Sequence, residues 1–310
     1  MKKIVKTLLI TVCAFVVFTL TSCGGGFFEK EYNVYSNIEY DETSGDALEI
    51  YIPKEKNNEG MKAILFISGE NWNYTEPNGA DVDLCKEYAE KGYITATMSY
   101  HDIGVFGNEE YTIWTILNDL TNAIAKLKSF TSELKINVTD LILHGRYSGG
   151  HIATLFAWSL PEKSAIPVKA VVNLAGHITF NESVFEELEN YQENDGIKLA
   201  CKLFGTTELE GYVMKDGTID VEALTKEQKD EIVSLVSPLT YLGAESTPVI
   251  FAYSAKDKKL SYKHSEALEA ALKDLGVSFH KFDYKNSGHS LALDPSISED
   301  ICDAMETYLK

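Results

Sequence analysis

The sequence predicts an α/β fold with a mostly parallel central sheet that is covered by helices on both faces. Two observations carry this prediction. Continuous apolar runs mark strands that are buried on both faces, and stretches with apolar residues at helical spacing separate these runs. After removal of an N-terminal leader, roughly 280 residues remain, which is enough for one large domain with a full core.

The elements alternate along the chain. Residues 33–40 and 48–53 alternate apolar and polar side chains, which predicts half-buried antiparallel strands. The buried strands are then predicted at 63–67, 93–100, 141–145, 168–176, 248–254 and 277–284. The helices are predicted at 81–91, 109–130, 151–160, 262–275 and 297–309. Strands that alternate with helices indicate parallel pairing in the sheet.

One segment, from His177 to Ser237, interrupts this alternation. It has no apolar run that could form a buried strand, and it contains acidic, helix-prone pieces such as residues 183–188. Because it falls between two predicted sheet strands, we expect a helical cap insertion at about 177–237. A solvated decoration with no part in binding is the alternative interpretation.

The N-terminus has the pattern of an export signal. Three lysines lie among the first six residues, and an apolar run at 8–20 follows that is short for a membrane span. The run ends in Leu20-Thr21-Ser22-Cys23, which resembles a bacterial lipobox. This resemblance implies a signal peptide over 1–22, a lipid on Cys23, a tether over 23–32 and a place in the bacterial cell envelope, on the exported side. An ordinary cleaved signal peptide with a chance cysteine is the alternative.

Composition excludes several classes of partner. The chain has 28 basic and 47 acidic side chains, and loss of the three leader lysines leaves 25 basic ones, a net charge near −22. Such a charge argues against nucleic acid and against a polybasic lipid-binding surface. The mature cysteines are Cys85, Cys201 and Cys302, an odd number without metal-ligand spacing. No phosphate loop or dinucleotide fingerprint occurs, so no cofactor and no metal are expected.

The stretch from Leu141 to Ala153, LILHGRYSGGHIA, carries the strongest motif. An apolar run enters a short corner and leaves it as a helix, as in a nucleophile elbow, where small residues stand two before and two after the central residue. Gly145 and Gly149 fit those places, and Tyr147 is then central. The pattern GxSxGGHxA is typical of the esterase/lipase group of α/β-hydrolases. The chain resembles that group over about 35–310, with tyrosine in place of the nucleophilic serine.

The resemblance extends to an acid and a base. Asp257 follows a predicted strand in Ser254-Ala255-Lys256-Asp257, which resembles the GxxD of the group. His289 follows the next strand, in Asn286-Ser287-Gly288-His289, and resembles its loop histidine. The order nucleophile, acid, histidine is that of the fold. We therefore expect Asp257 and His289 to pair at neighbouring loops.

Two other motifs depart from the group. Its HGGGW oxyanion loop corresponds here to Ser68-Gly69-Glu70-Asn71-Trp72, so the donors would come from the backbone of Gly69, Glu70 and Asn71, together with Ser148. The Glu70 carboxylate would oppose a developing negative charge. The Asp-Tyr-Arg corner of the group is replaced by Ser99-Tyr100-His101. Motifs that belong to the fold, such as Gly149-Gly150-His151, remain, whereas the motifs of the nucleophile, the oxyanion loop and the Asp-Tyr-Arg corner change. This pattern indicates that the chain lost its catalytic chemistry and kept its fold.

Three hypotheses for function follow. The first is an inactive or weakly active relative whose cleft still binds an ester-like or glycan-derived ligand, because Tyr147 replaces the serine. The second is an active ester hydrolase with a shifted register, in which Ser148 attacks with Asp257 and His289 in their usual roles. In that register Arg146 would stand two residues before the nucleophile, where the turn tolerates little bulk. The third is an envelope scaffold that binds another protein through the acidic cap.

Overall fold

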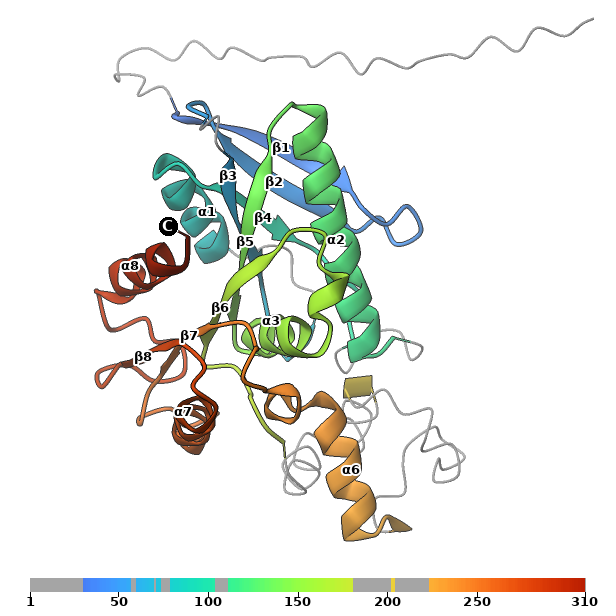
Figure 1. Ribbon diagram of the computed structural model, residues 1–310, viewed down its shortest axis with the longest axis vertical. Helices are drawn as coiled ribbons and strands as arrows, with labels where there is room; N and C mark the ends of the chain where they lie inside the picture. The colour runs from blue at the N-terminus through green and yellow to red at the C-terminus, as the bar shows by residue number, and fades with distance from the viewer. Residues whose placement is uncertain are drawn as a thin grey trace, which may run out of the picture. The chain divides into compact units, whose positions relative to one another are not determined.

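The computed structural model describes residues 30–56, 60–69, 71–73, 79–103, 111–180, 202–203 and 223–309. From Glu31 onward these residues belong to one unit built around a single sheet. Within the described residues the sheet has eight strands in the order β1-β2-β4-β3-β5-β6-β7-β8 (Figure 1). The α/β prediction is confirmed.

Two antiparallel strands open the sheet, β1 (Tyr32–Glu39) and β2 (Ala47–Pro53). β2 pairs antiparallel with β4 (Ile94–Met98), and β4 pairs parallel with β3 (Met61–Ile67). The remaining strands are all parallel to their neighbours: β5 (Val138–Arg146), β6 (Val168–Leu174), β7 (Val249–Tyr253) and β8 (Phe279–Asp283). The carboxyl ends of β5, β7 and β8 therefore meet at one edge of the sheet, where ligands bind in such folds.

Helices cover both faces of this sheet (Figure 1). On one face lie α2 (Ile113–Glu133), α3 (Ser148–Ser159) and α7 (Lys263–Leu275), and they share one buried apolar cluster with alternate residues of the strands. On the other face lie α1 (Gly79–Glu90) and α8 (Ile297–Leu309), which share a second cluster. In β3, for example, Leu65 belongs to the first cluster and Phe66 to the second, as the period of a strand requires.

The boundaries of the elements differ from the prediction by a few residues. The helix predicted to end at Phe130 continues to Glu133, because the hydroxyls of Thr131 and Ser132 donate to the carbonyls of Leu127 and Lys128 one turn earlier (2.8 and 2.7 Å). These bonds let hydroxyl residues remain helical. The strand predicted at 93–100 is confined to Ile94–Met98, since the chain turns at Ser99 toward the site.

The expected cap is described in part. Its last helix, α6 (Lys226–Val236), begins at Thr225, whose hydroxyl accepts from the backbone N–H of Gln228 (3.3 Å). Residues 181–201 and 204–222 lie outside the described residues, as do the leader and tether up to residue 29, with Cys23, and also Cys201. Cys85 and Cys302 are buried free thiols. No helix in the described ranges has both the length and the apolar run that a bilayer crossing needs.

Candidate functional site

The corner between β5 and α3 has the backbone of a sharp elbow. Tyr147 lies at its tip with φ 53° and ψ −120°, a conformation that bulky residues rarely adopt. Its N–H donates to the carbonyl of Leu174 (2.9 Å), and its carbonyl accepts from the N–H of His151 (3.1 Å). The turn is therefore anchored to the neighbouring strand on one side and to the first turn of α3 on the other.

Steric crowding explains the two glycines of the elbow. A Cβ on Gly149 would lie 2.0 Å from the carbonyl oxygen of Ile67, and one on Gly145 would lie 2.2 Å from the backbone of Gly149. Neither neighbour is a side chain that could move aside. These contacts explain why glycine stands two residues before and two residues after Tyr147, in the register expected from the motif.

His289 and Asp257 lie beside this corner. The Nδ1 atom of His289 lies 2.7 Å from a carboxylate oxygen of Asp257, whose side chain is 2% exposed. The other oxygen of Asp257 accepts from the backbone N–H groups of Lys259 and Leu260 (2.8 and 3.0 Å). The carboxylate is thereby fixed, and it orients the imidazole, whose side chain is 20% exposed.

The loop that carries His289 is tied to the loop that carries Asp257. The hydroxyl of Ser254 donates to the carbonyl of Ser287. Ser287 in turn donates its own hydroxyl to Asp294 (2.6 Å), and this hydrogen bond lowers the pKa of the Asp294 carboxyl. A network of buried hydroxyls thus holds both members of the acid–base pair in place.

The aromatic ring of Tyr147 lies flat against His289. The ring centroids are 4.3 Å apart with an interplanar angle of 18°. A serine at this corner would present its hydroxyl close to the backbone, whereas the phenol oxygen of tyrosine stands several ångströms farther out. The imidazole thus faces an aromatic ring where a working triad presents a nucleophile.

Ser148 points elsewhere. It is the first residue of α3, is 3% exposed, and its Oγ atom is buried without a hydrogen-bond partner. The same atom lies beside Gly69, where a Cβ added to the glycine would meet it at 2.4 Å. No hydrogen bond joins Ser148 to His289 among the residues that the structure describes. The geometry therefore does not bring the alternative nucleophile to the base.

The loop after β3 packs on the elbow. Gly69 contacts the backbone of Ser148 and Gly149, and the hydroxyl of Tyr100 donates to the carbonyl of Ser68 (2.6 Å). Asn71 and Trp72 both have φ 54°. Glu70 lies outside the described residues, so the position of its carboxylate stays a prediction from the sequence. Tyr100 therefore holds in place the loop that is predicted to supply the oxyanion donors.

A wall of aromatic and imidazole rings adjoins the same loop, and no pattern along the chain indicated it. It consists of Trp72, His151, His177, Phe180 and His264, which are in ring contact with one another. His151 accepts at Nδ1 from the indole N–H of Trp72 (2.9 Å), and its Nε2 lies 2.7 Å from the carbonyl of Val236. Since an indole N–H can only donate and a carbonyl can only accept, His151 is the neutral Nε2–H tautomer.

Burial keeps the imidazoles of this wall uncharged. Desolvation lowers the pKa of His151 and that of His264 to about 4, and it lowers the pKa of His177 well below its usual value. The Nδ1 atom of His177 is buried without a hydrogen-bond partner. At neutral pH the wall therefore presents neutral rings and one unused polar atom.

The Ser99-Tyr100-His101 corner contributes His101 to a second polar cluster. Nδ1 of His101 lies 2.9 Å from Asp119, a carboxylate that is 1% exposed, and 3.4 Å from Asp46. Ligand atoms of Asp41, His101 and Asp119 all lie within 4.8 Å of one another, a grouping that could hold a metal ion and that spacing along the chain did not suggest. Asp119 accepts from the backbone N–H of His101 (2.9 Å) and also engages its Nδ1 atom, so the imidazole is held by the carboxylate on the neighbouring helix α2.

Comparison with known proteins places this geometry in context. A sequence model of the BD-FAE family matches residues 48–272. Among solved structures, a truncated carbohydrate esterase from gut microbiota matches with a TM-score of 0.67 and 17% identity, covering 91% of this chain and 99% of the other. A bifunctional GH43-CE protein from Bacteroides eggerthii matches with a TM-score of 0.68 and 18% identity, covering 89% of this chain and 38% of the other.

A third similar structure is esterase 2 from Thermogutta terrifontis, phosphonylated by sarin, with a TM-score of 0.64 and 15% identity, covering 89% of this chain and 93% of the other. A search of curated proteins found no match. At these identities the structural likenesses establish the fold alone.

Proposed function

This chain belongs to the BD-FAE family, and we propose that it is an esterase-like α/β-hydrolase that binds a ligand in its cleft with little or no ester hydrolysis of its own. The observation that carries the proposal is the position of Tyr147. Its ring lies at the tip of the elbow and stacks on His289, where the reacting hydroxyl of a serine would stand.

The acid–base pair alone cannot hydrolyse an ester efficiently. Asp257 orients His289, but the imidazole needs a nucleophile within hydrogen-bond reach, at roughly 3 Å. The phenol of Tyr147 is a poor substitute because an ordinary tyrosine, with a pKa of about 10, holds little phenolate at neutral pH. The Ser148 hydroxyl lies beside Gly69 and forms no hydrogen bond with the base. Each candidate nucleophile is thus absent or misplaced.

The cleft nevertheless keeps surfaces that suit a ligand. The ring wall formed by Trp72, His151, His177, Phe180 and His264 is neutral at physiological pH because its imidazoles are buried. Neutral rings with an unused nitrogen favour an uncharged ligand that has hydroxyl or carbonyl groups and an apolar face. Two of the similar structures are carbohydrate esterases or contain such a domain, so we propose an ester-like or glycan-derived ligand.

The first test is a serine-directed phosphonate. The purified protein is expected to remain unlabelled by mass spectrometry under conditions that label the esterase from Thermogutta terrifontis, a structure of which is phosphonylated by sarin. Stoichiometric labelling at Ser148 would overturn the proposal and establish the hypothesis of an active hydrolase with shifted register. Labelling at another residue would show that the reactive site lies elsewhere.

The second test restores the missing groups. Tyr147→Ser is expected to gain little p-nitrophenyl acetate hydrolysis, and Tyr147→Ser with Glu70→Gly to gain more. At about 5 Å and an effective dielectric near 20, the Glu70 carboxylate would repel an oxyanion by roughly 3 kcal/mol, which corresponds to about a hundredfold in rate. Glu70→Gly alone is the matched control and should stay inactive. Equal rates for Tyr147→Ser and the double variant would remove Glu70 from this account.

A membrane anchor is a separate part of the proposal. The lipobox-like sequence that ends at Cys23 supports a lipid on that cysteine and attachment to the bacterial cell envelope. Cys23→Ala should move the protein from the membrane fraction to the soluble one or leave it unprocessed. Unchanged fractionation and mass would exclude the anchor. The scaffold hypothesis concerns the acidic cap, most of which lies outside the described residues, and no observation favours it over ligand binding.

A further inference from the structure

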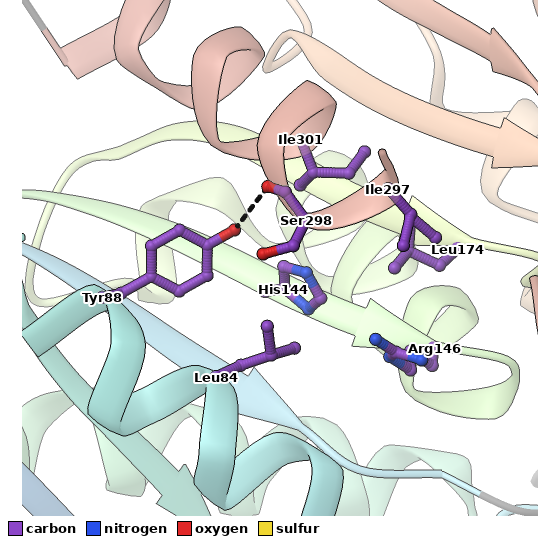
Figure 2. A pocket seen from close by; sticks show the side chains of 8 residues that line it. All are labelled: Leu84, Tyr88, His144, Arg146, Leu174, Ile297, Ser298 and Ile301. Atoms are coloured by element: carbon purple, nitrogen blue, oxygen red, sulfur yellow. Dashed lines mark hydrogen bonds between the residues drawn. The ribbon is translucent and has the colours of Figure 1, made fainter. Parts of the chain in front are cut away.

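A crevice opens beside the elbow, on the sheet face covered by α1 and α8. It is small: the centres of water-sized spheres can occupy about 20 Å³ of it, and the figure of about 230 Å³ for its empty space includes the solvent at its open mouth. Figure 2 shows the side chains of the two helices and of the strands β5 and β6 turned into it. Most of the wall is apolar, and the lining residues are Leu84, Tyr88, His144, Arg146, Leu174, Ile297, Ser298 and Ile301.

Arg146 is the cation of this crevice and the single arginine of the sequence, which has 27 lysines. Its Nε atom is buried and has no hydrogen-bond partner. Among the residues that the structure describes, no carboxylate forms an ion pair with its guanidinium. A partly buried charge without a counterion is costly, because the protein supplies neither water nor an opposite charge in full.

The polar neighbours of Arg146 do not fill this role. Burial, and then the nearby charge of Arg146, lower the pKa of His144 to about 3, so its imidazole is neutral. Tyr88 donates its hydroxyl to the carbonyl of Ser298 (3.4 Å; Figure 2), and Ser298 donates its own hydroxyl to Glu87 (3.0 Å). Glu87 also pairs with Lys91 (2.9 Å). The two hydroxyls and Glu87 are thus engaged with one another, and the guanidinium is the group left for a ligand.

We propose that this crevice binds a small monocarboxylate, with the carboxylate on the guanidinium of Arg146 and the aliphatic end against Leu84, Ile297 and Ile301. A planar guanidinium presents two parallel N–H donors that match the two oxygens of a carboxylate. A phosphate dianion would need more donors than one guanidinium supplies, and it would meet mainly hydrocarbon elsewhere on the wall. The use of arginine at this one position, in a chain that otherwise uses lysine, fits a need for the forked geometry.

The crevice is lined by residues that adjoin both halves of the functional site along the chain. Arg146 directly precedes Tyr147, and Ile297 and Ser298 begin the helix that follows the loop of His289. The crevice nevertheless belongs to the face of α1 and α8, whereas the ring wall around Trp72 belongs to the apolar cluster of the other face. The carboxylate site is therefore distinct from the cleft, and the proposal holds whether or not Tyr147 is inert.

The single arginine makes the test direct. Full-length protein labelled with ¹⁵N-arginine gives one side-chain Nε–H resonance, which reports on Arg146 alone. Sodium acetate is titrated against sodium chloride at constant ionic strength. Acetate is expected to shift this resonance saturably at millimolar concentrations, because the buried N–H gains an acceptor, and butyrate should bind more tightly, by up to about fourfold for each methylene buried.

Variants separate the crevice from general charge effects. Arg146→Lys keeps the charge but loses the fork, and it should weaken acetate binding at least about tenfold in calorimetry or thermal-shift titration. Lys163→Met removes an exposed charge elsewhere and should leave the affinity unchanged. If acetate does not shift the Nε–H resonance, or if chloride shifts it equally, the proposal is overturned. This outcome needs only the wild-type protein, so it stands even if the Arg146 variant fails to fold.

Discussion

The two halves of the site are built by different forces. The elbow half is held by close backbone packing, because Gly145 lies against Gly149, and Gly149 against the backbone of Ile67. His151 adds hydrogen bonds to Trp72 and Val236. The acid–base half is held by hydrogen bonds to one carboxylate, because Asp257 receives two backbone N–H groups and the imidazole of His289. The first half carries Tyr147 at its tip, and the second holds a hydrogen-bonded acid and histidine.

The backbone of the elbow is held by the contacts of its glycines, whichever side chain stands at position 147. The ring of Tyr147 itself packs against His289 and against the apolar cluster of α1 and α8. A substitution at this position can therefore change the chemistry of the site while the glycine contacts keep the turn. The acid–base pair persists for a similar reason, since Asp257 also accepts the N–H groups that close its own loop. Three measurements test this contrast.

The largest effect is expected in the elbow. Gly149→Ala would place a Cβ 2.0 Å from the carbonyl oxygen of Ile67, which is backbone and cannot move aside. We expect a loss of roughly 4 kcal/mol or more in the free energy of unfolding, or no folded protein at all. Gly243→Ala is the control, because its added Cβ has no atom within 4 Å. Urea denaturation that finds both variants equally stable would contradict packing as the force that holds the elbow.

A smaller effect is expected in the acid–base half. Asp257→Ala leaves the N–H groups of Lys259 and Leu260 and the Nδ1 atom of His289 without their acceptor, which should cost about 3 kcal/mol of stability. Asp257→Asn keeps a side-chain oxygen for the two backbone groups and should recover a large part of that loss. If the asparagine variant unfolds as readily as the alanine one, the charge and not the loop closure holds this half.

The smallest effect concerns acid sensitivity of the elbow half. The pKa of His151 is about 4 in the folded protein, lowered by burial, against about 6.5 for an unfolded histidine. The unfolded chain therefore binds the proton first, so stability is full above pH 6.5 and falls as the pH falls toward 4. For this one group the loss between pH 7 and pH 5 is about 2 kcal/mol.

His151→Gln lacks that titrating group. The variant should be less stable than the wild type at pH 7, because the indole N–H of Trp72 loses its acceptor, but its stability should fall less steeply on acidification. Chemical denaturation at pH 5, 6 and 7 measures both slopes. Parallel slopes would mean that His151 is not the neutral, buried link between the oxyanion loop and the cap helix α6.

Much of the site was predictable because it depends on local pattern. The strands follow from continuous apolar runs, and the elbow follows from two glycines at fixed distance from Tyr147, where steric limits leave few alternatives. The approach of Asp257 to His289 follows from parallel neighbouring strands, whose carboxyl ends lie at one edge of the sheet. In each case a short stretch of chain, or the topology alone, determines the geometry.

Other features required the tertiary structure. The place of the Ser148 hydroxyl, beside Gly69 and without a hydrogen bond to His289, depends on how two loops pack, and a register argument could not exclude its approach to the base. The ring wall joins Trp72, His177 and His264 from separate parts of the chain. Arg146 stood out in the sequence only as a bulky neighbour of the elbow. Its buried Nε and the crevice around it arise where α1, α8 and β5 meet, and contacts between elements distant in sequence leave no periodic pattern along the chain.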